Sequence, residues 1–116
     1  MLALSAQSRV FVAIEPIDFR KGIDSLGGVC RRELDRNPLD GAVYVFRNRR
    51  ANAIKVLVYD GQGFWCCTKR LSTGRFQWWP SDASAAVGFS ARELSILLWN
   101  GRPDQAQIAP DWRAVA

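Results

Sequence analysis

The sequence contains no histidine, and this absence excludes several kinds of chemistry. Without an imidazole the chain forms neither a Ser-His-Asp nor a Cys-His triad, and it has no histidine to bind a metal or carry a proton. Long apolar runs are missing too, so we expect no transmembrane helix and no membrane partner. The N-terminal residues do not combine a basic segment with an apolar run, so we expect no signal peptide and a cytoplasmic location.

Cysteine is scarce as well, with Cys30, Cys66 and Cys67 as the three examples. An odd number with two adjacent members fits neither a disulfide framework nor a zinc site. In a strand, Cys66 and Cys67 would point to opposite faces of the sheet. We therefore interpret the cysteines as small buried side chains in a reducing compartment, and we expect no metal and no other cofactor.

The acidic residues do not form a catalytic pattern. A two-metal nuclease needs several clustered carboxylates, whereas the acids here lie mostly outside the basic part of the chain. We interpret Asp18 as a helix cap and Asp60 as a turn residue. The glycines at 61 and 63 form too short a segment for a phosphate-binding loop. We therefore expect no catalytic residue and no enzyme activity, and a metal-dependent nuclease is the weakest alternative.

The positive charge is concentrated in one part of the chain. The whole chain carries a net charge of +5, from 16 Lys and Arg against 11 Asp and Glu. Residues 1–40 have a net charge of 0 and residues 76–116 carry −1, whereas residues 41–75 carry +6. A local excess of this size is typical of a protein that binds a polyanion. The alternative interpretation is a solvated sheet face that only keeps the protein in solution.

The composition predicts one small globular domain. Apolar residues make up 48% and charged residues 23% of the 116 positions, which is ordinary for a folded protein. A chain of this length is too short for two well-filled cores. We expect a single domain over residues 1–103 and a loose C-terminal tail over residues 104–116, where the apolar periodicity is weak.

The first third of the chain predicts a strand followed by a helix. Residues 9–14 have the composition of a strand, which Pro16 closes. Asp18 is a good helix N-cap, and apolar residues recur after it at helical spacing. We expect this helix to end at Asn37 and Pro38.

Strand-like runs follow, separated by turn residues, at 43–47, 53–59, 64–71 and 76–79. A second helix is expected after Ser90, which can form a capping box with Glu93, and should end near residue 99. Together the elements predict an α+β fold. In this fold an antiparallel meander sheet of four to five strands has two helices packed on one of its faces.

The turn at residues 60–63 fixes the register of two of these strands. It pairs Lys55 with Thr68 across the hairpin, and paired residues share a face of the sheet. The face that carries Lys55 should then also carry Leu57, Tyr59, Phe64, Cys66 and Arg70. Lys69 should lie on the opposite, apolar face, near its edge.

A five-residue turn at 48–52 fixes the next strand in the same way. It places Val45 and Arg47 on the face of Lys55, and Tyr44 and Phe46 on the apolar face. The two turns together predict that one basic face of the sheet carries cations from separate hairpins.

We predict that this basic face and the hairpin tip at 48–52 bind DNA phosphates. The predicted contacts are Arg47, Arg49, Arg50, Lys55, Lys69, Arg70 and Arg75, with Arg20 and Lys21 at the start of the first helix as further candidates. Exposed rings can stack on bases, and the candidates are Tyr59, Phe64 and Trp79. The alternative for these rings is core packing, or an apolar patch covered by a helix or a partner chain.

Several blocks of the sequence resemble, in order, those of a known family. The blocks are Asp18-Phe19-Arg20-Lys21-Gly22-Ile23-Asp24, Val45-Phe46-Arg47-Asn48-Arg49-Arg50, Asp60-Gly61-Gln62-Gly63-Phe64, Lys69-Arg70-Leu71 and Gly74-Arg75-Phe76. They resemble the small accessory protein of the insertion-sequence-sixty-six family of bacterial transposons. That protein is encoded by the second open reading frame and is often called TnpB, although it is unrelated to the RNA-guided nucleases of that name. The resemblance covers about residues 9–100.

The resemblance implies a non-catalytic, accessory role in DNA transposition in the bacterial cytoplasm, beside a separate transposase that carries the strand-transfer acids. We expect two partners, namely the transposase and DNA, either at transposon ends or without sequence preference, and we leave a homo-oligomer open. The alternative is a protein–protein adaptor that docks onto the transposase without binding DNA.

The sequence departs from the family pattern at two places. Trp78-Trp79-Pro80 has one residue more than the usual spacing, and Asp111-Trp112-Arg113 lies further along the chain than the corresponding ending of the family. These departures concern the last predicted strand and the tail.

Overall fold

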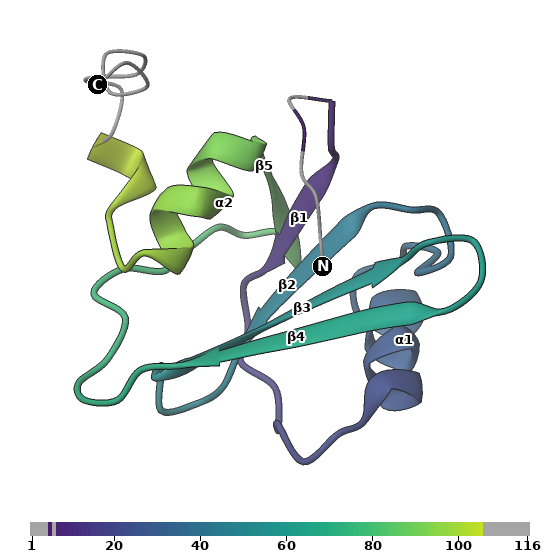
Figure 1. The fold of residues 1–116 in the computed structure, drawn as a ribbon, viewed down its shortest axis with the longest axis horizontal. Helices are drawn as coiled ribbons and strands as arrows, with labels where there is room; N and C mark the ends of the chain where they lie inside the picture. The colour runs from purple at the N-terminus through teal and green to yellow at the C-terminus, as the bar shows by residue number, and fades with distance from the viewer. Residues whose placement is uncertain (1–4, 6, 106–116) are drawn as a thin grey trace.

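The computed structural model describes residue 5 and residues 7–105. Five strands form one sheet, with the bounds β1 Val10–Ala13, β2 Val43–Arg47, β3 Ala53–Tyr59, β4 Phe64–Arg70 and β5 Ala86–Phe89. The helices are α1 Ile23–Arg32, α2 Ala91–Leu98 and the short 3₁₀ helix η1 Pro103–Gln105. The strands lie in the order β4-β3-β2-β1-β5, as Figure 1 shows. The predicted α+β class is confirmed.

The sheet is mixed, whereas the sequence predicted a purely antiparallel one. β2, β3 and β4 form the predicted antiparallel meander. β1, however, runs parallel to β2, and β5 runs antiparallel to β1. The parallel pair follows from the connection between β1 and β2, because a chain that returns in the same direction needs a long crossover, which here contains α1.

The fifth strand is not where the sequence predicted it. The run at 76–79 forms no strand; Phe76 is buried, and the indole of Trp79 donates a 2.9 Å hydrogen bond to the carbonyl of Ala13. These large side chains fill the core instead of forming a ladder. The actual strand, β5, is a short segment that contains alanine and glycine, residue types that are depleted in strands and give a weak signal.

The start of α1 also differs from the prediction. The helix begins at Ile23 with Gly22 as its N-cap, whereas Asp18 was the predicted cap. Asp18 instead accepts a 2.9 Å hydrogen bond from the backbone N–H of Arg20 and forms part of the connection before the helix. The predicted capping box of α2 is confirmed, since Ser90 and Glu93 each accept a hydrogen bond from the backbone N–H of the other.

The two helices cover opposite faces of the sheet, so the prediction that both pack on one face is wrong. Leu94 and Leu97 of α2 pack with one core cluster, whereas Leu26 and Val29 of α1 pack with the other. The sheet lies between these two apolar layers, and Figure 1 shows the helices on its two sides. The four residues 43–46 of β2 are all buried, which is typical of a strand covered on both faces.

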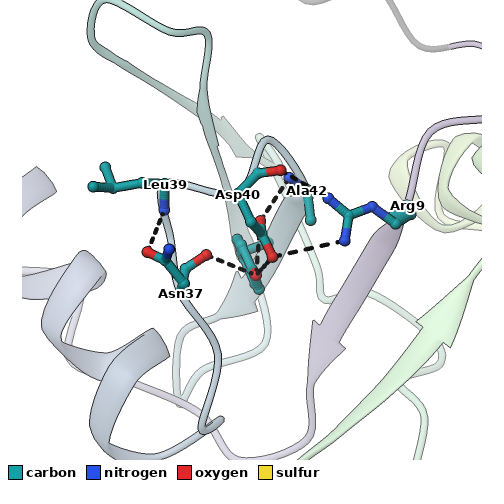
Figure 2. A network of polar contacts seen from close by, with 6 residues as sticks. Arg9, Asn37, Leu39, Asp40 and Ala42 are labelled. Carbon is teal, nitrogen blue, oxygen red and sulfur yellow. Dashed lines mark hydrogen bonds and ion pairs between the residues drawn. The ribbon is translucent and has the colours of Figure 1, made fainter.

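A polar network holds the connection between α1 and β2, and Figure 2 shows it from close by. The buried hydroxyl of Tyr44 donates to the carboxylate of Asp40, whose oxygens lie 3.0 and 3.1 Å away. Asp40 also accepts a 2.8 Å hydrogen bond from the N–H of Ala42. Arg9 donates to the Asp40 carbonyl at 2.7 Å and so ties the network to the start of β1. Burial raises the pKa of the Tyr44 hydroxyl, which keeps it protonated as a donor.

None of the helices within residues 5 and 7–105 is long and apolar enough to cross a membrane. Of the tail predicted at 104–116, Asp104 and Gln105 belong to η1, whose Pro103 is buried. The rest of the predicted tail, including the displaced Asp111-Trp112-Arg113 block, lies outside the described residues.

We expect the substitution Asp40→Ala to lower the free energy of unfolding by about 1–3 kcal/mol, because it removes the acceptor of the Ala42 N–H and leaves the buried Tyr44 hydroxyl only the more distant Asn37 carbonyl, 3.4 Å away. Urea unfolding of this variant measures the loss. In a Tyr44→Phe background the hydroxyl is already gone, so the same substitution should cost less. An equal loss in both backgrounds would show that the two side chains are not coupled.

Candidate nucleic-acid interface

The register of β3 and β4 is the predicted one. Lys55 pairs with Thr68, and the face that they share carries the other residues expected on it. Asp60 closes the turn by accepting hydrogen bonds from the backbone N–H groups of residues 62 and 63 and from the indole of Trp65. These hydrogen bonds hold the pKa of Asp60 below its usual value.

The register of β2 and β3 is shifted by one residue from the prediction. Phe46 pairs with Lys55, and Arg47 pairs with Ile54. The cause lies in the turn, where the Asn48 side-chain oxygen accepts hydrogen bonds from the N–H groups of residues 52 and 53, each at 3.1 Å. The Asn48 N–H in turn donates to the carbonyl of residue 53, so the ladder closes around the four residues 49–52 instead of the predicted five.

This shift divides the cations that the sequence placed together, because a change of one residue moves a strand's side chains to the other face. Tyr44 and Phe46 therefore lie on the face of Lys55, whereas Val45 and Arg47 lie opposite. Arg70 shares the face of Lys55, and Lys69 lies on the opposite face as expected. The predicted single basic face does not form.

Lys55 stabilises the fold, because its ammonium group forms hydrogen bonds with the connection between β1 and α1. Its Nζ donates to the carbonyl of Phe19 at 3.1 Å and to that of Lys21 at 3.3 Å. The same atom lies 5.0 Å from the centre of the Phe19 ring. These contacts anchor the connection that precedes α1.

Lys69 and Arg47 are also engaged within the fold. The ammonium group of Lys69 donates to the carbonyl of Leu98 at the end of α2 and lies 5.1 Å from the centre of the Trp99 ring. The guanidinium of Arg47 lies 5.8 Å from the centre of the Trp79 ring. These half-buried cations contact the protein itself, so they are poorly placed to contact a phosphate.

Of the predicted stacking residues, Trp79 is half-buried and bonded to β1, which matches the alternative interpretation as a core residue. Tyr59 and Phe64 are half-buried neighbours whose rings meet edge to face, with centres 5.2 Å apart. The Tyr59 hydroxyl donates to the carbonyl of Gly61. Base stacking by these rings stays a prediction.

The exposed cations gather at one end of the sheet instead of on one face. The turn at 48–52 accepts hydrogen bonds from the loop after β4, through the N–H groups of Leu71 at 2.9 Å and Phe76 at 2.7 Å. On the other side, the N–H of Ile17 donates to the carbonyl of Arg47 at 3.0 Å and brings the β1–α1 connection alongside. We call the exposed arginines of these segments the basic end, which consists of Arg20, Arg49, Arg50, Arg70 and Arg75. In Figure 1 the turn and the loop lie together at the left.

An open cleft of about 830 Å³ lies at the basic end, between residues 17–20 and residues 48–50. Arg20 lines one wall, and Arg49 and Arg50 line the other. Asp18 also lines the cleft and forms a two-pronged ion pair with Arg20, with N–O distances of 2.6 and 3.0 Å. The hydrogen bonds from Arg20 hold the pKa of Asp18 well below its usual range, so the carboxylate stays charged and moderates Arg20. No local sequence pattern indicates that Arg20 and the hairpin tip form one cleft.

The described residues contain no group of three or more Cys, Asp or Glu side chains arranged to hold a metal ion. All three cysteines are free thiols. Burial raises the pKa of the Cys30 thiol to about 12 and also raises that of Cys66, so both remain protonated at neutral pH.

The fold and its basic end define a small α+β protein with a cationic cleft. Comparison with known families identifies the family of this protein. The family model described as IS66 Orf2-like protein matches residues 8–107, and the chain belongs to this family. The resemblance in the sequence blocks is thereby confirmed. The family is an accessory one rather than a catalytic one, which indicates an accessory role in transposition.

Two relatives come from Sinorhizobium fredii strain NBRC 101917 / NGR234. The uncharacterized protein y4hO is 43% identical over 98 residues, which cover 84% of both chains. The uncharacterized protein y4jC is 33% identical over 98 residues, which cover 84% of this chain and 83% of y4jC. No solved structure matches the chain.

We expect Lys55→Met to lower the free energy of unfolding by about 1–3 kcal/mol, because hydrogen bonds of a charged donor to two backbone carbonyls are lost while the aliphatic stem is kept. Arg49→Ala, at the exposed tip, should change it by less than about 0.5 kcal/mol. Chemical denaturation of both variants measures the two free energies of unfolding and so distinguishes Lys55, which supports the fold, from Arg49, which lies on the surface. Equal effects would contradict this division.

Proposed function

We propose that the chain assists transposition by binding DNA phosphates through the basic end. The observation that carries the proposal is the pairing of the 48–52 turn with the loop after β4, which brings Arg49, Arg50 and Arg75 to one exposed end from separate hairpins. In the described part of the chain no carboxylate forms an ion pair with any of these three residues. Their charge is therefore free to meet an external anion.

Guanidinium groups suit this role because they bind phosphate oxygens in a planar, two-pronged geometry and release the counterions condensed on the duplex. Phosphate contacts carry no direct sequence information, so we expect binding without strong sequence preference. Lys55, Lys69 and Arg47, which the sequence also suggested as contacts, act in this proposal as supports of the fold. In this proposal the protein acts in the bacterial cytoplasm, beside a transposase.

We expect the double variant Arg49→Ala/Arg50→Ala to bind DNA more weakly and with a lower salt dependence. The slope of log affinity against log salt should fall by about 0.9 for each phosphate contact that is lost. Fluorescence anisotropy with a transposon-end duplex and an unrelated duplex measures both quantities. The matched control is Arg31→Ala/Arg32→Ala, which removes the same charge from exposed positions in the last turn of α1, away from the basic end.

An equal loss in the control would mean that only the net charge matters, and the proposal would fail. Failure of the wild-type protein to retain DNA at about 50 mM salt, together with co-purification with the transposase, would instead identify an adaptor whose basic end meets an acidic protein surface.

We expect Asp18→Asn to strengthen DNA binding several-fold and to raise the salt slope by about one, because it releases Arg20 from its ion pair at the cleft. Since the pKa of Asp18 lies below its usual range, the carboxylate is ionised throughout the range of about pH 5–8, and the effect should not vary with pH there. The anisotropy assay at both ends of this range tests it. Unchanged affinity would remove Arg20 from the interface.

A further inference from the structure

β4 forms an open edge of the sheet. It is the last strand in the order β4-β3-β2-β1-β5, and within residues 5 and 7–105 no segment pairs with its outer side. Figure 1 shows it as the outermost strand. With seven residues it is as long as its neighbour β3, whereas β5 at the other edge has four. An exposed edge of this length is a template for pairing with another strand.

The hydrogen-bond pattern shows which residues of β4 have backbone N–H and C=O groups available to a partner strand. The N–H of Asp60 donates to the carbonyl of Gly63, and the N–H of Leu71 donates to the carbonyl of Asn52. Hydrogen-bonded pairs alternate along an antiparallel ladder, so within β4 the residues 65, 67 and 69 are bonded to β3. The residues that direct N–H and C=O outward are therefore Phe64, Cys66, Thr68 and Arg70.

We propose that a second copy of this chain pairs with the β4 edge in antiparallel orientation, so that two sheets join into one. Pairing of the outward residues places Phe64 opposite Arg70 of the second copy and Cys66 opposite Thr68 of the second copy. This register uses all of β4, and the two-fold axis passes at Cys67. Each Cys67 then faces its own counterpart in a non-hydrogen-bonded pair, where Cα atoms lie about 4.5 Å apart.

Side-chain complementarity across the axis favours a second copy as the partner. Trp65, which is 44% exposed, would lie opposite Lys69 of the second copy. The indole of Trp65 donates a hydrogen bond to the carboxylate of Asp60. The ammonium group of Lys69 of the second copy would therefore lie near both an aromatic ring and an anion. On the other face, Arg70 of the second copy would meet Phe64.

The same pairing accounts for an exposed tryptophan at the end of α2. Trp99 is 83% exposed, and its ring lies 5.1 Å from the ammonium group of Lys69. Because Lys69 would face Trp65 of the second copy, the dimer would bring two large exposed rings to opposite sides of one cation. The four large apolar residues that are exposed in the described chain include both of these tryptophans.

The dimer does not depend on DNA binding, and the two properties are separable. The two-fold axis directs the ends of the two β4 strands in opposite directions, so each basic end lies at a different end of the joined sheet. Arg70 joins the paired edge, whereas the other four arginines of each basic end remain free to bind DNA, as in two-fold proteins that contact two sites on one duplex.

The first test blocks the edge. Thr68→Pro removes an outward N–H without touching the ladder to β3, and proline is tolerated on edge strands in this orientation. Light scattering after size exclusion should give two chains for the wild-type protein and for the control Thr68→Ser, and one chain for Thr68→Pro with an unchanged circular dichroism spectrum. A wild-type mass of one chain at every concentration up to the solubility limit would overturn the proposal.

The second test determines the register between the two β4 strands and does not depend on the proline variant. Under a mild oxidant such as oxidised glutathione, the variant Cys66→Ser, which keeps Cys67, should form a covalent dimer on a non-reducing gel, because the expected Cα separation permits a disulfide. Cys67→Ser should not form it, and the buried Cys30 serves as an internal control in both variants. Cross-linking of Cys67→Ser, or of neither variant, would overturn this register of pairing.

Discussion

The arrangement of charge in this protein depends on one set of hydrogen bonds, those that close the turn between β2 and β3. The side chain of Asn48 accepts hydrogen bonds from two consecutive N–H groups and closes the ladder around a four-residue loop, one residue shorter than the sequence predicted. That register puts Arg47 on the face of α2 and leaves Lys55 on the face of α1. It also presents the carbonyls of residues 51 and 52, which hold the loop after β4 against the tip.

The cations of this chain therefore fall into two groups with different tasks. Lys55 and Lys69 lie on opposite faces of the sheet, and each donates to backbone carbonyls of a segment packed on its own face. Burying the stems of such side chains while satisfying the ammonium group stabilises the fold. The arginines of the basic end are exposed, and those of the turn and the following loop carry no ion pair in the described chain. An accessory protein of the IS66 Orf2-like family thus combines a rigid sheet with a cationic end.

The sequence predicted the parts of the fold whose local chemistry is strong. The turn at 60–63 carries an aspartate and two glycines, and the register of β3 and β4 followed from it correctly. The capping box at Ser90 was equally clear. The predicted register at 48–52 was wrong because the Asn48 side chain accepts hydrogen bonds that reset the turn, and β5 was not predicted because its alanine and glycine give a weak strand signal. The gathering of Arg20 with the hairpin tip depends on a contact between Ile17 and the end of β2, which no local pattern encodes.

The central claim is that the exposed end of the sheet, rather than one of its faces, contacts DNA. The most direct measurement is a titration of the ¹⁵N-labelled protein with a short duplex, followed by amide chemical shifts. The account predicts shifts confined to residues 17–20, 48–52 and 70–76, with the amides of α1 at 23–32 unchanged. Shifts centred on α1, or an absence of shifts at low salt, would contradict it.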